Sequence, residues 1–168
     1  AGAAVTLVAG PVSLPTPRGV VRTDVVSAMD MRREVMAVVG DHDIFIGVAA
    51  VADYRPAESR EHKIKKGSGA MTLELAANPD ILADVAARKR PPFCVGFAAE
   101  SQNLDEYAQG KRLAKKLPLV VGNLVQHGLG GETNQGCLYD DHGVHPIPPA
   151  DKLTIARAIV THIAGMLS

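Results

Sequence analysis

The sequence is short of net charge and of long apolar runs, and each shortage argues against a class of protein. Its 18 Lys and Arg residues balance 18 Asp and Glu residues, so the formal net charge is zero. A neutral total gives no support for a nucleic-acid surface or for a patch that binds anionic membranes. No stretch approaches the roughly 20 apolar residues of a membrane span, and no signal-peptide pattern is present. We therefore expect a cytoplasmic protein.

Cysteine is also sparse, and the histidines are scattered along the chain. The two cysteines, Cys94 and Cys137, lie far apart and lack the spacing of metal ligands. Cys94 lies in an apolar run, where a buried free thiol is favoured over a catalytic one. The six histidines form no HxxxH pair and have no cysteine at ligand spacing, so the pattern argues against a zinc site. His142 and His145 flank an expected hairpin, and we expect both at the surface.

The overall amino-acid composition is that of a folded domain. Of 168 residues 46% are hydrophobic and 21% charged, which suits one domain with a buried core. Short apolar stretches bounded by Gly or Pro are typical of parallel strands covered by helices on both faces. We assign such strands to residues 4–9, 43–49, 93–97 and 119–121. Helical patterns alternate with them at 26–39, 79–88, 104–117 and 152–167, and Asn78 is the expected N-cap of the second.

This alternation predicts an α/β fold, with a Rossmann-like, doubly wound and mostly parallel sheet between helices. Shorter strands are expected at 72–75, 136–139 and 143–147, the last two joined at Asp140-Asp141-His142 as a small antiparallel hairpin arm. The first four residues resemble the end of a helix that enters a second strand. We therefore expect an earlier strand and a glycine-rich turn to belong before Ala1.

Ligands of open α/β sheets bind at the carboxyl ends of the strands. After the second predicted strand, the small residues of segment 49–52 would let a ligand approach the backbone, and Asp53 offers a carboxylate or, equally well, a turn cap. Phe97 follows the third strand and would place an aromatic ring at the same edge. A core position is the commoner role for a lone phenylalanine.

Two groups of lysines are candidates for binding an anion. Lys63, Lys65 and Lys66 lie in a charged, glycine-bearing segment, while Lys111 and Lys115 are four apart and share a helix face. Ammonium groups that converge on one edge would suit a triphosphate, although a solvated face is the commoner role of any one such run. The glycine-rich segment 128–136 does not match a phosphate loop. We expect it to connect flexibly to the hairpin.

Six stretches of this sequence occur together in a recognisable order: VTLVAGPVSLPTP (5–17), IFIGVAAVADYRP (44–56), HKIKK (62–66), NPDIL (78–82), VGFAAE (95–100) and KRLAKK (111–116). In them the chain resembles the phosphopantothenate–cysteine ligase domain of the bacterial bifunctional phosphopantothenoylcysteine decarboxylase/phosphopantothenate–cysteine ligase. The resemblance covers most of the chain. It implies that residues 1–168 are such a ligase domain without its N-terminal strand and glycine-rich segment.

The resemblance also implies a reaction and its participants. CTP, with Mg²⁺, would activate 4'-phosphopantothenate as an acyl-cytidylate, and L-cysteine would then displace CMP in coenzyme A biosynthesis. A homodimer is implied, with the hairpin near 136–147 as a reasonable contact, together with fusion to a flavin-dependent decarboxylase. No flavin, nucleic acid or membrane is expected as a partner of this portion.

Residue by residue, the resemblance assigns Lys63 to catalysis of the second half-reaction and leaves the magnesium ligands unidentified. It assigns nucleotide binding to the following residues: Ala49, Ala50, Asp53, Lys63, Asn78, Pro79, Asp80, Ile81, Phe97, Lys111 and Lys115. Two alternatives stay open. One is a nicotinamide-dependent oxidoreductase, although no G-x-G-x-x-G follows any predicted strand. The other is a truncated, non-catalytic nucleotide-binding fragment.

Overall fold

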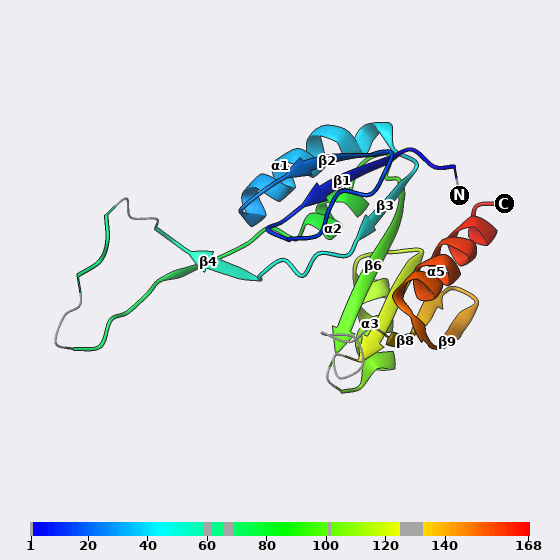
Figure 1. Ribbon diagram of the computed structural model, residues 1–168. Coiled ribbons are helices and arrows are strands. Elements are labelled where there is room, and N and C mark those ends of the chain that lie inside the picture. Colours follow the sequence, from blue (N-terminus) through cyan, green and yellow to red (C-terminus); the bar gives the residue numbers. More distant parts are fainter. Residues whose placement is uncertain (1, 59–61, 66–68, 101, 125–132) are drawn as a thin grey trace. The chain divides into compact units, whose positions relative to one another are not determined.

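The computed structural model describes residues 2–58, 62–65, 69–100, 102–124 and 133–168. The chain forms two compact units. The first unit contains Ala1–Val38 and Ala49–Asp84, and the second contains Val39–Val48 and Val85–Ser168. Figure 1 labels the helices and strands of both.

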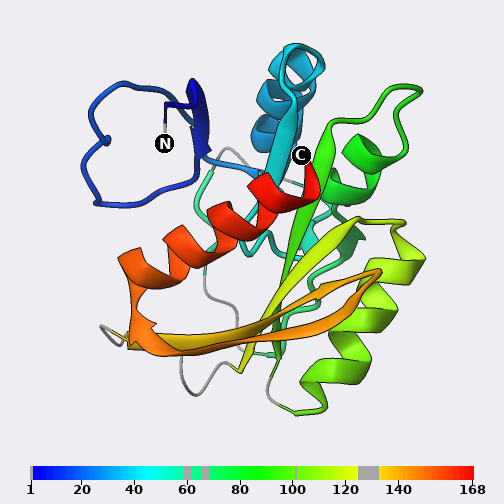
Figure 2. The same cartoon turned by 90° about the vertical axis from the view of Figure 1, so that its right-hand side faces the viewer.

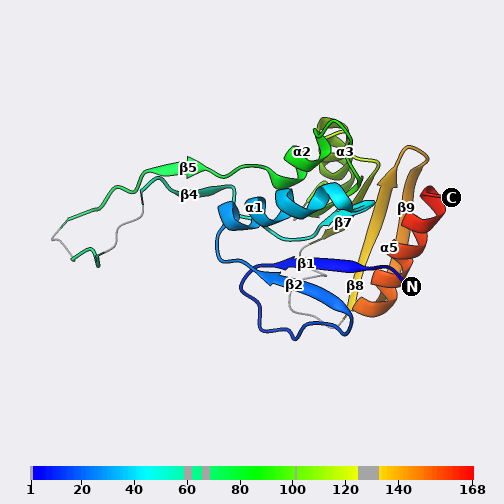
Figure 3. The ribbon, with the colours of Figure 1, turned by 90° about the horizontal axis from the view of Figure 1, so that it is seen from above.

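The first unit contains a two-stranded parallel sheet. Strand β1 (Val5–Ala9) pairs with β2 (Val20–Asp24), as Figure 3 shows. Helix α1 (Ala28–Val38) follows, and the short 3-10 turn next in the chain, η1 (Val39–Asp41), already belongs to the second unit. The start of α1 is fixed by a reciprocal pair of bonds, since the Ser27 hydroxyl accepts from the Asp30 amide and the Asp30 carboxylate accepts from the Ser27 amide.

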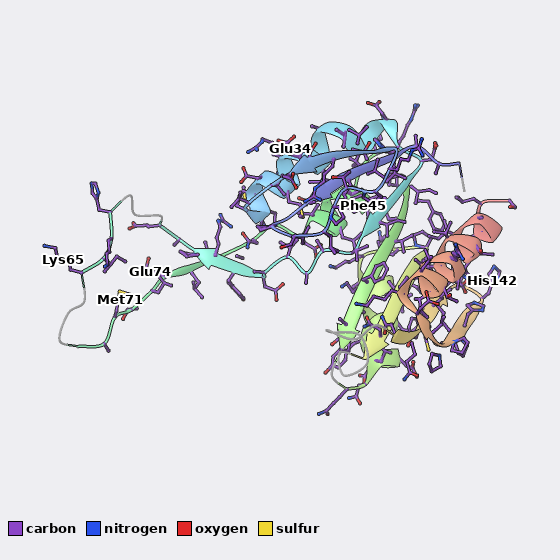
Figure 4. The ribbon with its side chains drawn as sticks, viewed as in Figure 1. Glu34, Phe45, Lys65, Met71, Glu74 and His142 are labelled. Atoms are coloured by element: carbon purple, nitrogen blue, oxygen red, sulfur yellow. The ribbon has the colours of Figure 1, made fainter. Side chains whose placement is uncertain are left out.

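An antiparallel arm completes the first unit. Strand β4 (Tyr54–Pro56) pairs with β5 (Leu75–Ala77), and the two run side by side in Figure 3. The described residues between them, 57–58, 62–65 and 69–74, continue beyond the strand pair, with Lys65, Met71 and Glu74 along this stretch (Figure 4). Helix α2 (Ile81–Ala86) comes directly after the arm.

The second unit is built on a five-stranded sheet with the order β3-β6-β7-β8-β9. Strands β3 (Ile44–Gly47), β6 (Phe93–Glu100) and β7 (Leu119–Leu124) are parallel. Strands β8 (Thr133–Asp140) and β9 (Gly143–Asp151) extend the sheet in antiparallel pairing. The sheet is therefore mixed, with a parallel half and an antiparallel half.

Helices α3 (Leu104–Ala114) and α5 (Lys152–Met166) lie on opposite faces of this sheet, as Figure 2 shows. Against α5, the sheet buries alternate apolar side chains of four strands: Val95, Leu119, Val121, Leu138 and Ile147. Helix α5 contributes Ile155, Ile159 and Ile163, whose spacing of four places them on one stripe. The α3 face includes Tyr139, which is fully buried and donates a hydrogen bond of 2.6 Å to Asp105.

Gly122 in β7 and Gly136 in β8 allow these two strands to approach closely. Gly136 also borders the point, between Asn134 and Gly136, where the pairing of β8 with β9 is irregular. A Cβ atom added at Gly136 would lie 2.5 Å from the carbonyl oxygen of Gly122 in β7. Because that neighbour is backbone, no side-chain rotation could relieve the clash, so this strand contact requires glycine.

The predicted α/β class is confirmed, and each of the four buried strands and four helices that were predicted has a counterpart. Strands β2 and β4 were not predicted, and the strand expected at 72–75 lies at Leu75–Ala77 instead. The hairpin is confirmed, but it is no separate arm. Strand β8 pairs with β7, so the hairpin extends the main sheet, and Leu138, Tyr139 and Ile147 are buried in it.

Candidate functional site

The segment after β3 carries the first group of predicted site residues. Ala49 and Ala50 are exposed and lie in no helix or strand, which leaves their backbone groups accessible. Asp53 is exposed as well, and its backbone carbonyl accepts a hydrogen bond of 2.7 Å from the amide of Asn78. The backbone of Asp53 is therefore held beside the predicted Asn78–Ile81 turn within the first unit.

Asn78 holds this group together. Its side-chain amide donates to the carbonyl of Ala52 at 2.8 Å, and its side-chain oxygen accepts from Arg55 at 3.1 Å. Arg55 also donates to the carbonyl of Ala77 on the neighbouring strand. The sequence prediction did not include Arg55. Its signal is the Tyr-Arg-Pro of the 44–56 stretch, but only the β4–β5 pairing shows that Arg55 reaches Asn78.

The prediction that Asn78 caps the following helix is wrong. Helix α2 begins at Ile81, and the Asp80 carboxylate accepts from the amide of Ala83 at 3.0 Å, which is the bond of an N-cap. The side chain of Asn78 is instead engaged with the preceding strand and segment. Pro79 is half-buried and Ile81 is buried, so Ile81 anchors the turn by packing.

Lys63 lies among residues without helix or strand structure and is exposed, as is Lys65. Both belong to the first unit. Lys66, predicted as part of the same cluster, lies outside the described residues, and so do 128–132 of the predicted glycine-rich connection. Residues 133–136 of that segment belong to β8 and are ordered strand rather than a flexible connection.

The remaining predicted residues belong to the second unit. Phe97 lies inside β6, because the strand predicted to end there extends to Glu100. Its ring packs against the apolar core below α5, as the commoner role of a lone phenylalanine suggests. Its carbonyl accepts a hydrogen bond from the Lys111 ammonium on α3. Lys115 is the C-cap of α3, one turn further on, and is half-buried like Lys111.

The structure thus assembles two groups and assigns them to different units. Asp53, Asn78, Pro79, Asp80 and Ile81 form one. Phe97, Lys111 and Lys115 form the other. Within the second group, two ammonium groups on adjacent helical turns offer positive charge for an anionic ligand. The convergence of both groups on one triphosphate stays a prediction.

A third cluster was missed altogether. Asp140 at the end of β8 is bonded to His145 of β9 and to His162 of α5 at 3.0 and 2.8 Å. The sequence argued against a metal site because these residues show no ligand spacing, yet their ligand atoms all lie within 4.8 Å of one another. His162 is 17 positions from His145, so only the packing of α5 brings them together.

Burial alone would raise the pKa of the Asp140 carboxyl group. Hydrogen bonds from His145, His162 and the backbone amide of His142 outweigh burial and lower that pKa to about 2. Asp140 is therefore a carboxylate at neutral pH despite its burial.

Comparison with known proteins places the chain in a family. Residues 1–167 match the family described as "DNA/pantothenate metabolism flavoprotein C-terminal domain". The chain belongs to this family. The domain is 48% identical over 169 residues to the Coenzyme A biosynthesis bifunctional protein CoaBC of Escherichia coli, covering 96% of the chain and 42% of the relative. It is 45% identical over 165 residues to the CoaBC protein of Vibrio cholerae, covering 95% and 41%.

The domain therefore spans about two fifths of the length of these relatives. Among solved structures, the C-terminal domain of a CoaBC protein superposes with a TM-score of 0.82 at 34% identity, covering 99% of this chain and 76% of that one. A complex of a Cab2 mutant with phosphopantothenate-cysteine shares the fold, with a TM-score of 0.68 at 16% identity over 89% of this chain and 56% of that one. In the described part of the chain, no helix is long and apolar enough to cross a membrane.

Proposed function

We propose that the domain joins 4'-phosphopantothenate to L-cysteine with CTP. One observation carries the proposal: the domain aligns over 95–96% of its length, at 45–48% identity, with bifunctional proteins of coenzyme A biosynthesis. The assembled groups are compatible with it, since one presents an exposed carboxylate beside an asparagine and the other presents two ammonium groups.

The proposed reaction has two steps that balance. A carboxylate oxygen of 4'-phosphopantothenate attacks the α-phosphorus of CTP, and the bond to the β-phosphate oxygen breaks to release pyrophosphate. The amine of cysteine then attacks the activated carbonyl carbon. The bond to the CMP oxygen breaks, and the amine loses a proton as the amide forms. Activation supplies the leaving group, so the protein's task is to position the reactants and stabilise charge.

Residues of both units have proposed roles. Lys111 and Lys115 would balance phosphate charge, and the backbone of Ala49 and Ala50 would contact the nucleotide. Lys63 would stabilise the acyl-cytidylate while cysteine attacks. Its place in a stretch without helix or strand suits a group that closes over an intermediate.

Mg²⁺ is proposed as a cofactor of the same site. Magnesium favours oxygen ligands and often binds through one or two carboxylates together with substrate phosphates. The exposed carboxylate of Asp53 fits that preference. The ion would neutralise phosphate charge when bound.

The test is pyrophosphate release by the full-length protein with CTP, Mg²⁺ and 4'-phosphopantothenate, with and without cysteine. We expect release to depend on phosphopantothenate, and Lys63→Gln to lower formation of the amide product by tenfold or more. The matched control is Lys89→Gln, an exposed lysine outside the proposed site, which should retain activity. Unchanged product formation in Lys63→Gln would remove Lys63 from the mechanism.

Two results would contradict the ligase proposal itself. CTP binding by calorimetry without any pyrophosphate would indicate a non-catalytic nucleotide-binding domain. A change in nicotinamide fluorescence on binding, with no effect of CTP, would favour the oxidoreductase alternative.

The partners are proposed on the same basis. The relatives are named bifunctional, and we propose a flavin-dependent decarboxylase as the second half of a cytoplasmic fusion protein. We also propose a homodimer. The β4–β5 arm is a better candidate contact than the hairpin at 136–147, because Tyr54, Met71, Leu73 and Leu75 expose apolar side chains along it.

A further inference from the structure

The cluster of Asp140, His145 and His162 lies entirely in the second unit, on the α5 side of the sheet. Asp140 is the last residue of β8, and His145 is the third residue of β9 after a two-residue turn. The register pairs His145 with Leu138, whose side chain belongs to the core below α5. His162 precedes Ile163 on the apolar stripe of α5. One carboxylate and two imidazoles thus meet where the hairpin contacts the helix.

The carboxylate is fixed before any ligand arrives. One oxygen of Asp140 accepts from the backbone amides of His142 and Gly143 at 2.7 and 3.1 Å. The same oxygen meets the His145 Nε2 atom at 3.0 Å, and the other meets the His162 Nε2 atom at 2.8 Å. The Asp140 side chain is 1% exposed, whereas those of His145 and His162 are 40% and 22% exposed. The cluster is therefore anchored from inside and reached from the imidazole side.

The two imidazoles are also turned toward each other. Their ring centroids are 4.8 Å apart with planes inclined by 52°, and the three ligand atoms lie within 4.8 Å of one another. Around a tetrahedral ion with bonds of about 2.0–2.1 Å, ligand atoms stand about 3.4 Å apart. The two contacts at 2.8 and 3.0 Å would lengthen by about half an ångström on that basis. Each ring must supply its own part of this change by rotating, and both the His145 and the His162 side chains are partly exposed.

We infer that Asp140, His145 and His162 form a binding site for one divalent transition-metal ion of the Zn²⁺ type, which joins the β8–β9 hairpin to α5. Neutral imidazole nitrogen and a carboxylate oxygen are ligands that such ions favour, and three protein ligands leave a fourth position for water. Coordination needs a free electron pair on each Nε2 atom, so the proton there moves to Nδ1 or leaves to solvent. The site differs in ligand type from the all-oxygen environment that Mg²⁺ favours.

Its function would be structural. None of the residues assigned to the ligase reaction belongs to the cluster. An ion that binds the folded state and not the unfolded chain stabilises by mass action, so its effect appears as a higher melting temperature that depends on ion concentration.

The test uses the full-length protein, stripped with a chelator and then titrated with Zn²⁺ by calorimetry and with Co²⁺ by absorption. We expect one ion per chain at this site and visible Co²⁺ bands in the difference spectrum between wild type and His145→Gln. His145→Gln and His162→Gln should each weaken binding by roughly tenfold or more and abolish the Zn²⁺-dependent rise in melting temperature. Because the His145 ring is partly exposed, His145→Gln keeps the test valid if His162→Gln fails to fold.

His142→Gln is the matched control. His142 lies in the same hairpin turn, where Figure 4 labels it, and its contact with Asp140 is made by the backbone amide. It should bind the ion as tightly as wild type. Equal binding by wild type and His145→Gln would overturn the proposal, as would a Co²⁺ spectrum with a thiolate charge-transfer band, which would point to Cys137 or Cys94 instead. So would loss of stability in the histidine variants with no effect of Zn²⁺ on any of them, since that result describes hydrogen bonds alone.

Discussion

Replacement of Asn78 by alanine should weaken binding of CTP by loosening the segment that carries Asp53. The substitution removes two side-chain hydrogen bonds, one to the carbonyl of Ala52 and one from Arg55. A hydrogen bond contributes about 1 kcal/mol net, and water can partly replace these two because Asn78 is only half-buried. The expected loss is therefore about 1–2 kcal/mol. If nucleotide binding requires the ordered segment, Kd rises by about 5- to 30-fold, since 1.4 kcal/mol corresponds to a factor of ten.

A second variant separates the two bonds. Asn78→Asp keeps an oxygen for Arg55 but cannot donate to Ala52, and it places a carboxylate against that carbonyl. If the bond to Ala52 holds the segment, Asn78→Asp should lose as much affinity as Asn78→Ala, or more. If the contact with Arg55 matters more, Asn78→Asp should bind nearly as well as wild type.

Calorimetric titration with CTP measures both Kd values, and thermal unfolding of the same samples shows whether the fold survives. The expectation is a large change in Kd with a small change in melting temperature, because the affected bonds lie in one segment of the first unit. A Kd within twofold of wild type for both variants would refute the reasoning, since Asn78 would then have no part in shaping the nucleotide site.

Two further predictions concern stability in the second unit. Gly136→Ala should lower the free energy of unfolding by about 3 kcal/mol, because the added Cβ would lie 2.5 Å from the backbone oxygen of Gly122. Gly110→Ala, in the open middle of α3, should instead raise the free energy of unfolding by about 1 kcal/mol. Urea unfolding that ranks the two variants otherwise would contradict the contact between Gly136 and Gly122. Hydrogen bonds from the Thr154 side chain and backbone lower the pKa of the Asp151 carboxyl group, so its contribution to stability is present above its ordinary pKa and is lost as pH falls through the lowered one. Asp151 is the N-cap of α5, and Asp151→Asn should remove that share of the acid sensitivity in urea unfolding between pH 5 and 2. An unchanged pH dependence would show that the Asp151 carboxyl group is not ionised in the folded state.

Much of the secondary structure was predictable because it depends on local patterns. Apolar stretches bounded by Gly or Pro gave β1, β3, β6 and β7, and the three-to-four spacing of apolar residues gave the long helices. Strand β4 was not predictable in this way. It has three residues, one of them Pro56, and it is a strand only because β5 pairs with it. Helix α2 shows the limit for boundaries, since Asn78 and Asp80 are both capping residues by type and only the hydrogen bonds distinguish them.

The candidate site likewise has features that the sequence could predict and features that it could not. The types and order of residues identified the family, and the comparisons confirm that membership. The types and order of residues could not show that Arg55 supports Asn78. Nor could they show that the Phe97 ring lies in the core while its carbonyl accepts a hydrogen bond from Lys111. Both are contacts between residues more than ten positions apart, and such contacts depend on strand register and helix packing.

By itself, the sequence determined the alternation of strands and helices, the family, and the types of the residues that we propose bind a nucleotide. Each of these follows from local patterns or from short motifs in a fixed order. Tertiary structure alone decided that the hairpin at 136–147 extends the main sheet, because its pairing partner β7 lies outside it. It alone brought His162 to Asp140 as well. A hydrogen bond across 22 positions exists only once α5 has packed its isoleucine stripe on the sheet, and no spacing in the chain encodes that approach.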